Sequence, residues 1–145
     1  MALVLNEDQL QLKDAAKAFL GDKSPVSAFR KLRDTKDADG FDRKLWKEMA
    51  ALGWAGIIIP EEYGGSGFGY MGLGVILEES GRVLLASPLV STVLVGASAI
   101  VIGGNAQQKK DILPAIANGD CLLALALEEG PRNAPYSIAC KAEKT

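Results

Sequence analysis

The sequence contains no histidine and only two cysteines. Without histidine, the chain cannot form a Ser-His-Asp triad or a zinc site that includes histidine. Cys121 and Cys140 are too far apart in the sequence for a C-x-x-C motif, so we expect neither a metal site nor a disulfide framework. Two free thiols fit a reducing compartment.

Neither sign of charge dominates the chain, because 16 Lys and Arg residues are interspersed with 18 Asp and Glu residues. A domain that binds nucleic acid normally carries a concentrated basic surface, and we therefore expect no nucleic acid among the partners. The sequence also lacks Gly-Lys-Ser/Thr, which a P-loop for nucleotide phosphates requires.

Residues 83–108 contain no charged residue and are the only stretch that could suggest a membrane span. Pro88 interrupts this stretch, since proline belongs in the first turn of a helix rather than in its interior. The remaining apolar part, residues 89–102, is too short to cross a bilayer. We therefore expect a fully buried core helix there and no membrane span.

Three segments carry strong start signals for helices. Asn-x-x-Gln begins at Asn6 and again at Asn105, and this spacing is that of a capping box. Asp42 is a favourable N-cap residue, and Phe41 and Trp46 occupy the positions of a hydrophobic staple around it. The chain is thus predicted to be mainly helical.

A glycine-rich segment raises the question of a dinucleotide site, because G-x-G-x-x-G begins at Gly67. A Rossmann phosphate loop needs this motif directly after a strand, whereas residues 60–65 intervene after the apolar run 57–59. We interpret the motif as a turn in which glycine supplies unusual backbone angles before a helix.

A helix is expected over residues 70–85, although glycine lowers helix propensity. We interpret its glycines as places where another helix packs closely: Gly72, Gly74 and Gly81. The acidic pair Glu78-Glu79 is interpreted as solvated surface charge, since adjacent residues on a helix do not face each other.

The pattern changes after Gly119. Residues 121–127 form a continuous apolar run and residues 136–142 partly alternate, which favours two strands. We therefore predict a helical bundle with a short β segment at the C-terminus, divided into an all-helical domain over residues 1–119 and an incomplete β domain over residues 120–145.

Three stretches resemble segments of acyl-CoA dehydrogenases. Residues 52–69 read Leu-Gly-Trp-Ala-Gly-Ile-Ile-Ile-Pro-Glu-Glu-Tyr-Gly-Gly-Ser-Gly-Phe-Gly, similar to the loop joining two helices of their N-terminal helical domain. Residues 105–120 resemble the helix before the first strand of their middle β domain. Residues 125–131 read Leu-Ala-Leu-Glu-Glu-Gly-Pro and resemble the segment usually written Ala-Leu-Thr/Gln-Glu-Pro-Gly, which runs beside the flavin.

The resemblance implies FAD-dependent α,β-dehydrogenation of an acyl-CoA thioester. It places Leu125, Leu127 and Glu128 at the flavin and Ser91, Thr92 and Val95 at the acyl chain. The family's catalytic base is a glutamate of the C-terminal domain, so no catalytic residue is expected in this chain.

The implied partners are an acyl-CoA substrate and electron-transfer flavoprotein or another electron acceptor. The implied assembly is a homotetramer or a heteromer, in the cytoplasm or, in a eukaryote, in the mitochondrial matrix. Two alternatives stay open: a non-catalytic truncated or partner subunit that packs against a full-length dehydrogenase, and an unrelated helical binding module.

Overall fold

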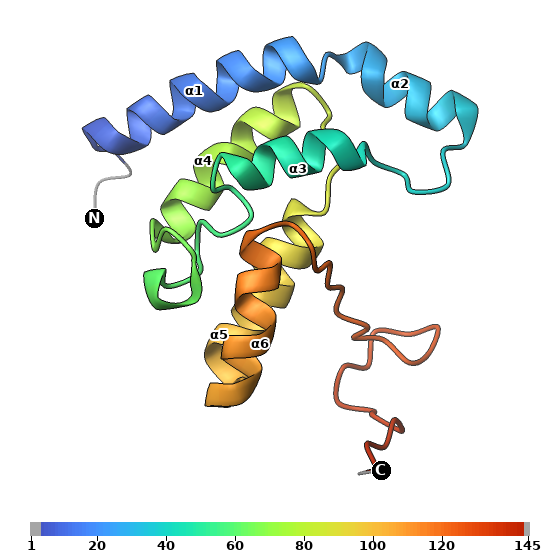
Figure 1. Ribbon diagram of the computed structural model, residues 1–145. Coiled ribbons are helices and arrows are strands. Elements are labelled where there is room, and N and C mark those ends of the chain that lie inside the picture. The colour runs from blue at the N-terminus through green and yellow to red at the C-terminus, as the bar shows by residue number, and fades with distance from the viewer. Residues whose placement is uncertain (1–3, 144–145) are drawn as a thin grey trace.

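The computed structural model describes residues 4–143 and is mainly helical, as predicted. The tail that follows the helices extends away from them (Figure 1). The elements are α1 (Glu7–Lys23), α2 (Val26–Thr35), α3 (Arg43–Ala51), the 3-10 turn η1 (Glu61–Tyr63), α4 (Gly69–Arg82), the π-helix η2 (Leu89–Ala97), α5 (Ser98–Gly103) and α6 (Ala106–Ala117).

The three predicted helix starts are confirmed. Asn6 and Asn105 each form a capping box with the glutamine three residues later, and the Asp42 carboxylate accepts hydrogen bonds from the second and third backbone N–H groups of α3. Phe41 and Trp46 both belong to the same apolar cluster, as the staple requires. These caps satisfy backbone donors that have no partner inside a helix.

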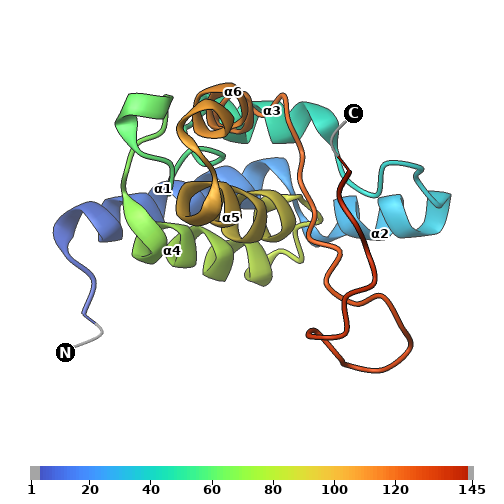
Figure 2. The same cartoon turned by 90° about the horizontal axis from the view of Figure 1, so that it is seen from below.

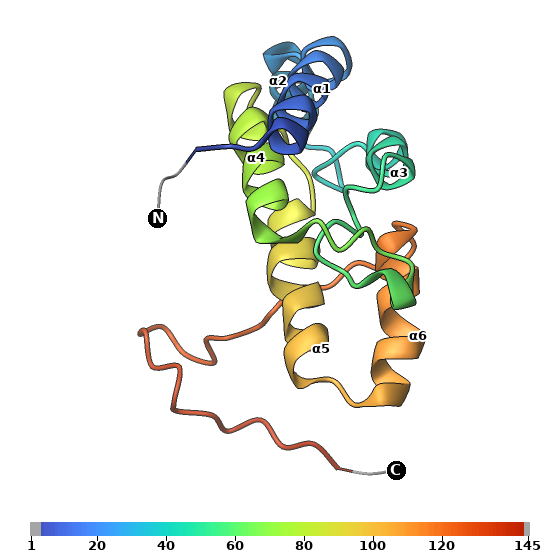
Figure 3. The same cartoon turned by 90° about the vertical axis from the view of Figure 1, so that its left-hand side faces the viewer.

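Helices α3 and α6 lie on one side of the bundle, and α4, η2 and α5 lie on the other (Figures 2 and 3). The larger apolar cluster includes Leu20, Trp46, Met49, Ile76 and Val93, which come from four different elements. A smaller cluster beside α6 contains, among its buried members, Ile59, Leu113 and Ile116. The bundle therefore positions η2 between the two clusters.

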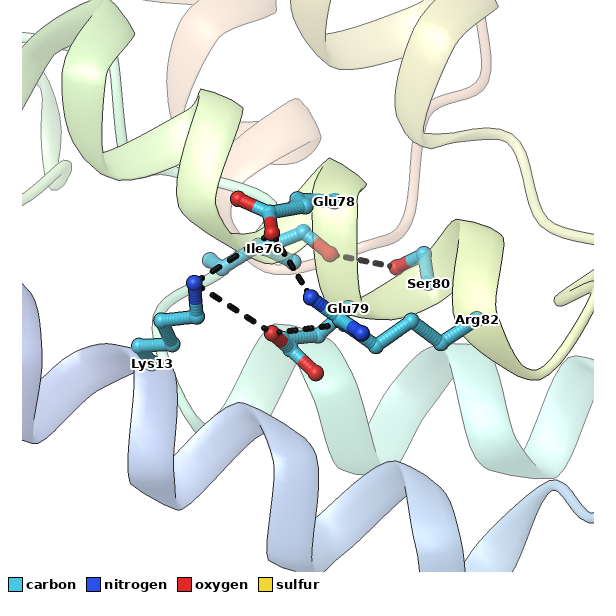
Figure 4. A network of polar contacts seen from close by, with 6 residues as sticks. All are labelled: Lys13, Ile76, Glu78, Glu79, Ser80 and Arg82. Atoms are coloured by element: carbon cyan, nitrogen blue, oxygen red, sulfur yellow. Dashed lines mark hydrogen bonds and ion pairs between the residues drawn. The ribbon is translucent and has the colours of Figure 1, made fainter.

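Helix α1 is held against α4 by an ion-pair network as well as by apolar contacts (Figure 4). Arg82 donates to Glu78 at 2.9 Å and to Glu79 at 3.1 Å, and Lys13 donates to Glu78 at 3.2 Å. The hydrogen bonds from Arg82 and Lys13 lower the pKa of the Glu78 carboxyl. The prediction of surface charge was wrong for Glu79, whose side chain is only 2% exposed, because its position on α4 faces α1.

The glycine-rich segment forms the predicted turn. Gly64, Gly67 and Gly69 all have positive φ angles, of 82°, 59° and 87°. The backbone N–H groups of Gly67 and Gly69 donate to the carbonyl oxygens of Ile59 and Ile57. Residues 57–59 do not form a strand, so the context that a Rossmann loop needs is absent from this part of the structure.

Two predictions about the C-terminal half need correction. The strands expected over residues 121–127 and 136–142 are not formed: residues 4–143 contain no strand, because an extended segment needs a neighbouring strand as its hydrogen-bond partner. The apolar segment 89–102 is helical but not fully buried, since Val90 and Ile102 are exposed. No helix within residues 4–143 combines the length and the apolarity needed to cross a membrane.

The glycines of α4 do not mark a close helix contact. A methyl group added at Gly74 or at Gly81 would meet no atom within 4 Å, whereas at Gly72 it would lie 2.2 Å from the ring of Phe68. We therefore expect Gly74→Ala to stabilise the fold by about 0.5–1 kcal/mol, because alanine loses less backbone entropy on folding. Urea unfolding measures the change. Gly72→Ala is the matched control and should destabilise the fold; equal effects of both substitutions would contradict this explanation.

Candidate functional site

The residues predicted to contact an acyl chain all lie on the π-helix η2. Ser91 is exposed, Thr92 is completely buried and Val95 is half-buried. η2 begins directly after Pro88 and continues without a break into α5. π-helices are rare and frequently occur at functional sites, so this segment is the first place to look for one.

A hollow of about 350 Å³ lies beside the start of η2, and we call it the η2 hollow. Three segments form its walls: the end of the α2–α3 loop, the start of η2 and the chain that leaves α6. Its lining residues are Gly40, Phe41, Ser87, Pro88, Ser91, Thr92, Leu122, Leu123 and Ala124. This volume is within the range of small-molecule sites.

The lining of the η2 hollow is apolar or weakly polar and includes no titratable side chain. The Ser91 hydroxyl donates to the Pro88 carbonyl at 3.3 Å, and the Thr92 hydroxyl is bonded to the backbone of Leu123. Such a lining can accommodate an apolar group but has no side chain able to accept a proton at neutral pH. The hollow is therefore suited to binding and positioning, not to acid-base chemistry.

Val95 does not line the η2 hollow, unlike Ser91 and Thr92. In an α-helix, residues four apart share a face, which would place Val95 beside Ser91. In a π-helix the repeating hydrogen bond spans five residues. In agreement, a methyl group added at Gly96 would be 3.2 Å from the carbonyl oxygen of Ser91, five residues earlier.

The predicted flavin-contacting residues lie in the tail just beyond the η2 hollow. Leu125 and Leu127 are 60% and 51% exposed. The Glu128 carboxylate accepts a hydrogen bond from the backbone N–H of Ala134 at 3.0 Å. The N–H groups of residues 125–128 donate no hydrogen bond to the part of the chain that the structure describes. Exposed apolar side chains and available N–H donors are the groups that a flavin ring would need here.

Sequence reasoning missed the contribution of the α2–α3 loop. Phe41 was predicted only as a staple residue, yet it also forms one wall of the η2 hollow. The guanidinium of Arg43 lies 5.4 Å from the Phe41 ring centre and forms two hydrogen bonds with Asp39. The hydrogen bond from Arg43 lowers the pKa of the Asp39 carboxyl. No local pattern relates this loop to residues 88–92, because the contact depends on the tertiary fold.

A larger hollow, of about 440 Å³, lies between α2 and the loop before α3. Its lining includes Lys31, Asp37, Asp39, Arg43 and Lys44, and Asp39 and Arg43 are already paired with each other. Small-molecule sites are mostly apolar with few polar groups. We therefore prefer the smaller η2 hollow, although it is not the larger of the two.

Residues 6–120 match the family described as "Acyl-CoA dehydrogenase, N-terminal domain". The chain belongs to the acyl-CoA dehydrogenase family, and the matched part is the N-terminal domain of that family. The family resemblance noted from the sequence is thereby confirmed.

Several relatives are similar over nearly all of the chain. Mitochondrial isovaleryl-CoA dehydrogenase of Arabidopsis thaliana is 34% identical over 99% of this chain, which spans 35% of that protein. The ChsE4-ChsE5 complex from Mycobacterium tuberculosis contains a similar chain, with a TM-score of 0.81 and 25% identity over 92% of this chain and 36% of that one. An acyl-CoA dehydrogenase complexed with FAD from Bacillus anthracis gives a TM-score of 0.76 and 30% identity, over 86% of this chain and 21% of that one. The chain therefore spans about a third of the length of the curated relative.

Proposed function

We propose that this chain forms the acyl-binding helical part of an FAD-dependent acyl-CoA dehydrogenase. The observation that carries the proposal is the position of the apolar η2 hollow, which adjoins a tail with exposed leucines and available N–H groups. The acyl chain would occupy the hollow and the flavin would lie against the tail. FAD, when bound, supplies the hydride acceptor for the β-carbon of the acyl group.

The chain's own residues have positioning roles in this proposal. Ser91 and Thr92 both line the η2 hollow, and Val95 lies on the same helix outside it. Leu125 and Leu127 would provide an apolar surface for the flavin, and the N–H groups near Glu128 would bond to the ring. Backbone donors held in this way favour the negative charge of a reduced flavin.

The proton acceptor would come from a glutamate outside this chain, as in the family.

We infer that residues 1–119 form the helical domain and that residues 120–145 open the next domain. The proposed partners are an acyl-CoA substrate and electron-transfer flavoprotein or another electron acceptor. One similar chain belongs to the ChsE4-ChsE5 complex, and we propose a homotetramer or a heteromer here. The similarity of this chain to a mitochondrial enzyme of A. thaliana favours a location in the mitochondrial matrix if the source is eukaryotic. Otherwise we propose the cytoplasm.

The proposed activity is tested on the protein that the complete reading frame encodes, purified with FAD. We expect turnover of acyl-CoA thioesters of one range of chain lengths with an artificial electron acceptor. A protein that binds neither FAD nor acyl-CoA would contradict the proposal and favour the non-catalytic partner subunit.

The acyl side is tested by Ser91→Phe in the same protein. Because the added ring would fill part of the η2 hollow, we expect the KM for the longest accepted acyl chain to rise about tenfold, which corresponds to about 1.4 kcal/mol. The KM for the shortest chain should change little. Val90→Phe is the matched control, because Val90 is adjacent, exposed and outside the lining. If both variants had the same chain-length profile, the η2 hollow would not hold the acyl chain.

A further inference from the structure

Thr92, in the π-helix η2, holds the tail through both backbone groups of Leu123. The Thr92 hydroxyl accepts a hydrogen bond from the Leu123 N–H at 3.0 Å and donates one to the Leu123 carbonyl oxygen at 3.1 Å. Thr92 is 0% exposed. A hydroxyl has a single proton to donate, and Leu123 receives it, so this hydroxyl is not a donor for a ligand in the η2 hollow.

A second contact fixes Leu123 at the same place. A methyl group added at Gly96 would lie 2.6 Å from Leu123 Cβ and 3.2 Å from its Cδ1. Leu123 can approach η2 this closely only because position 96 has no side chain. The hydroxyl of Thr92 and the bare backbone of Gly96 together form a seat for one residue of the departing chain.

This seat is the last polar connection between the tail and the helices. Cys121 still donates to the Ala115 carbonyl oxygen. From Leu122 onward, the two Thr92 bonds are the only hydrogen bonds that join the tail to a helix within residues 4–143. The direction in which the chain leaves the helices therefore depends on Leu123.

The connection also determines which side chains share a face. In an extended chain, residues two apart point to the same side, and such a backbone after Leu123 would place Leu123, Leu125 and Leu127 in one row. A slip of one residue would replace this row by the alternate one. Thr92 holds the N–H and the C=O of one residue, and the contact of the Leu123 side chain with Gly96 makes that residue Leu123, so the two contacts together oppose such a slip.

We propose that Thr92 is a positioning residue that sets the register of the flavin-facing segment, rather than a contact of the acyl chain. This inference rests on the proposed function for its consequence in catalysis, but its structural part does not. It assigns Ser91 to the acyl side and the Thr92 hydroxyl to the flavin side of the same helix.

The structural part is tested on the 145-residue chain by amide hydrogen exchange at Leu123. Thr92→Val has almost the same shape but no hydroxyl, and it should speed exchange of the Leu123 N–H by about tenfold, since a net hydrogen bond is worth about 1 kcal/mol or slightly more. Thr92→Ser keeps the hydroxyl and should restore slow exchange. Val90→Ala is the control and should change nothing. An unchanged rate in Thr92→Val would overturn the proposal.

If Thr92→Val does not fold, Gly96→Ala provides the second variant, because its methyl group would push Leu123 out of the seat while Thr92 stays intact. Faster exchange at Leu123 is expected in a chain that still unfolds cooperatively. If the Leu123 N–H exchanged at the wild-type rate in that variant, the proposed role of Thr92 and Gly96 in holding Leu123 would equally be contradicted.

The catalytic part is tested in the flavin-loaded protein encoded by the complete reading frame. For Thr92→Val we expect kcat to fall about tenfold with less than a twofold change in the KM for acyl-CoA, and Thr92→Ser to recover most of kcat. A raised KM with unchanged kcat would make Thr92 a substrate contact and overturn the proposal. Absence of turnover in the wild type would refute the proposed function instead, and the exchange at Leu123 would still decide the role of Thr92.

Discussion

Gly65→Ala is expected to destabilise the chain by about 3 kcal/mol or more, at the upper end of overpacking effects. A methyl group at this position would lie 2.0 Å from the Ile59 carbonyl oxygen and 2.6 Å from that of Gly56. Both atoms belong to the backbone, so no side-chain rotation can relieve the clash. Urea unfolding followed by circular dichroism measures the loss.

Gly64→Ala is the matched control in the adjacent position. Gly64 has a φ of 82°, yet a methyl group there would meet nothing within 4 Å. Its substitution should cost only the conformational strain of a left-handed residue, about 1–2 kcal/mol. If the two alanine variants were equally stable, the close approach of Gly65 to the Ile59 carbonyl would not exist in solution.

Trp46→Ala should be the most destabilising side-chain truncation in α3, at about 3–5 kcal/mol. Trp46 is only 3% exposed and lies in the larger apolar cluster. Its indole N–H also donates to the Gly119 carbonyl oxygen at 3.2 Å, which ties α3 to the turn that follows α6. Truncation therefore removes packing volume and the link between two helices at once.

Trp46→Phe separates the two contributions. Phenylalanine retains much of the apolar contact but leaves the Gly119 carbonyl oxygen without its donor, at a cost of about 1–3 kcal/mol. Thermal unfolding of both variants under the same buffer conditions gives the difference. If Trp46→Phe were as unstable as Trp46→Ala, packing around the larger ring, and not the hydrogen bond or the apolar area, would dominate.

The features that the sequence predicted well depend on neighbouring residues. The caps at Asn6, Asp42 and Asn105 and the turn around Gly67 are each determined within a few residues. The burial of Glu79 was not predictable in this way, because it depends on Lys13, which is far away in the sequence.

The candidate site was predicted only in part for the same reason. Family resemblance directed attention to Ser91 and Thr92, and both do line the η2 hollow. Phe41 and Leu123 reach that hollow from distant parts of the chain, and no local pattern identifies them. Neither of the two expected strands formed, over residues 121–127 or 136–142, because the two segments do not pair with each other and residues 4–143 offer no other strand. The change from α to π hydrogen bonding in residues 89–97 has no compositional signal that we recognise.

The π-helix has a consequence for comparing this chain with its relatives. Each hydrogen bond in Leu89–Ala97 encloses one more residue than an α-helical bond. The residues that are neighbours on successive turns therefore differ from those of an α-helix. Deleting one residue from this segment would change which residues share a face of the helix after the deletion. Gly96 would then turn away from Leu123. In this segment, a single-residue gap between two homologous sequences is a change of geometry rather than a change of length.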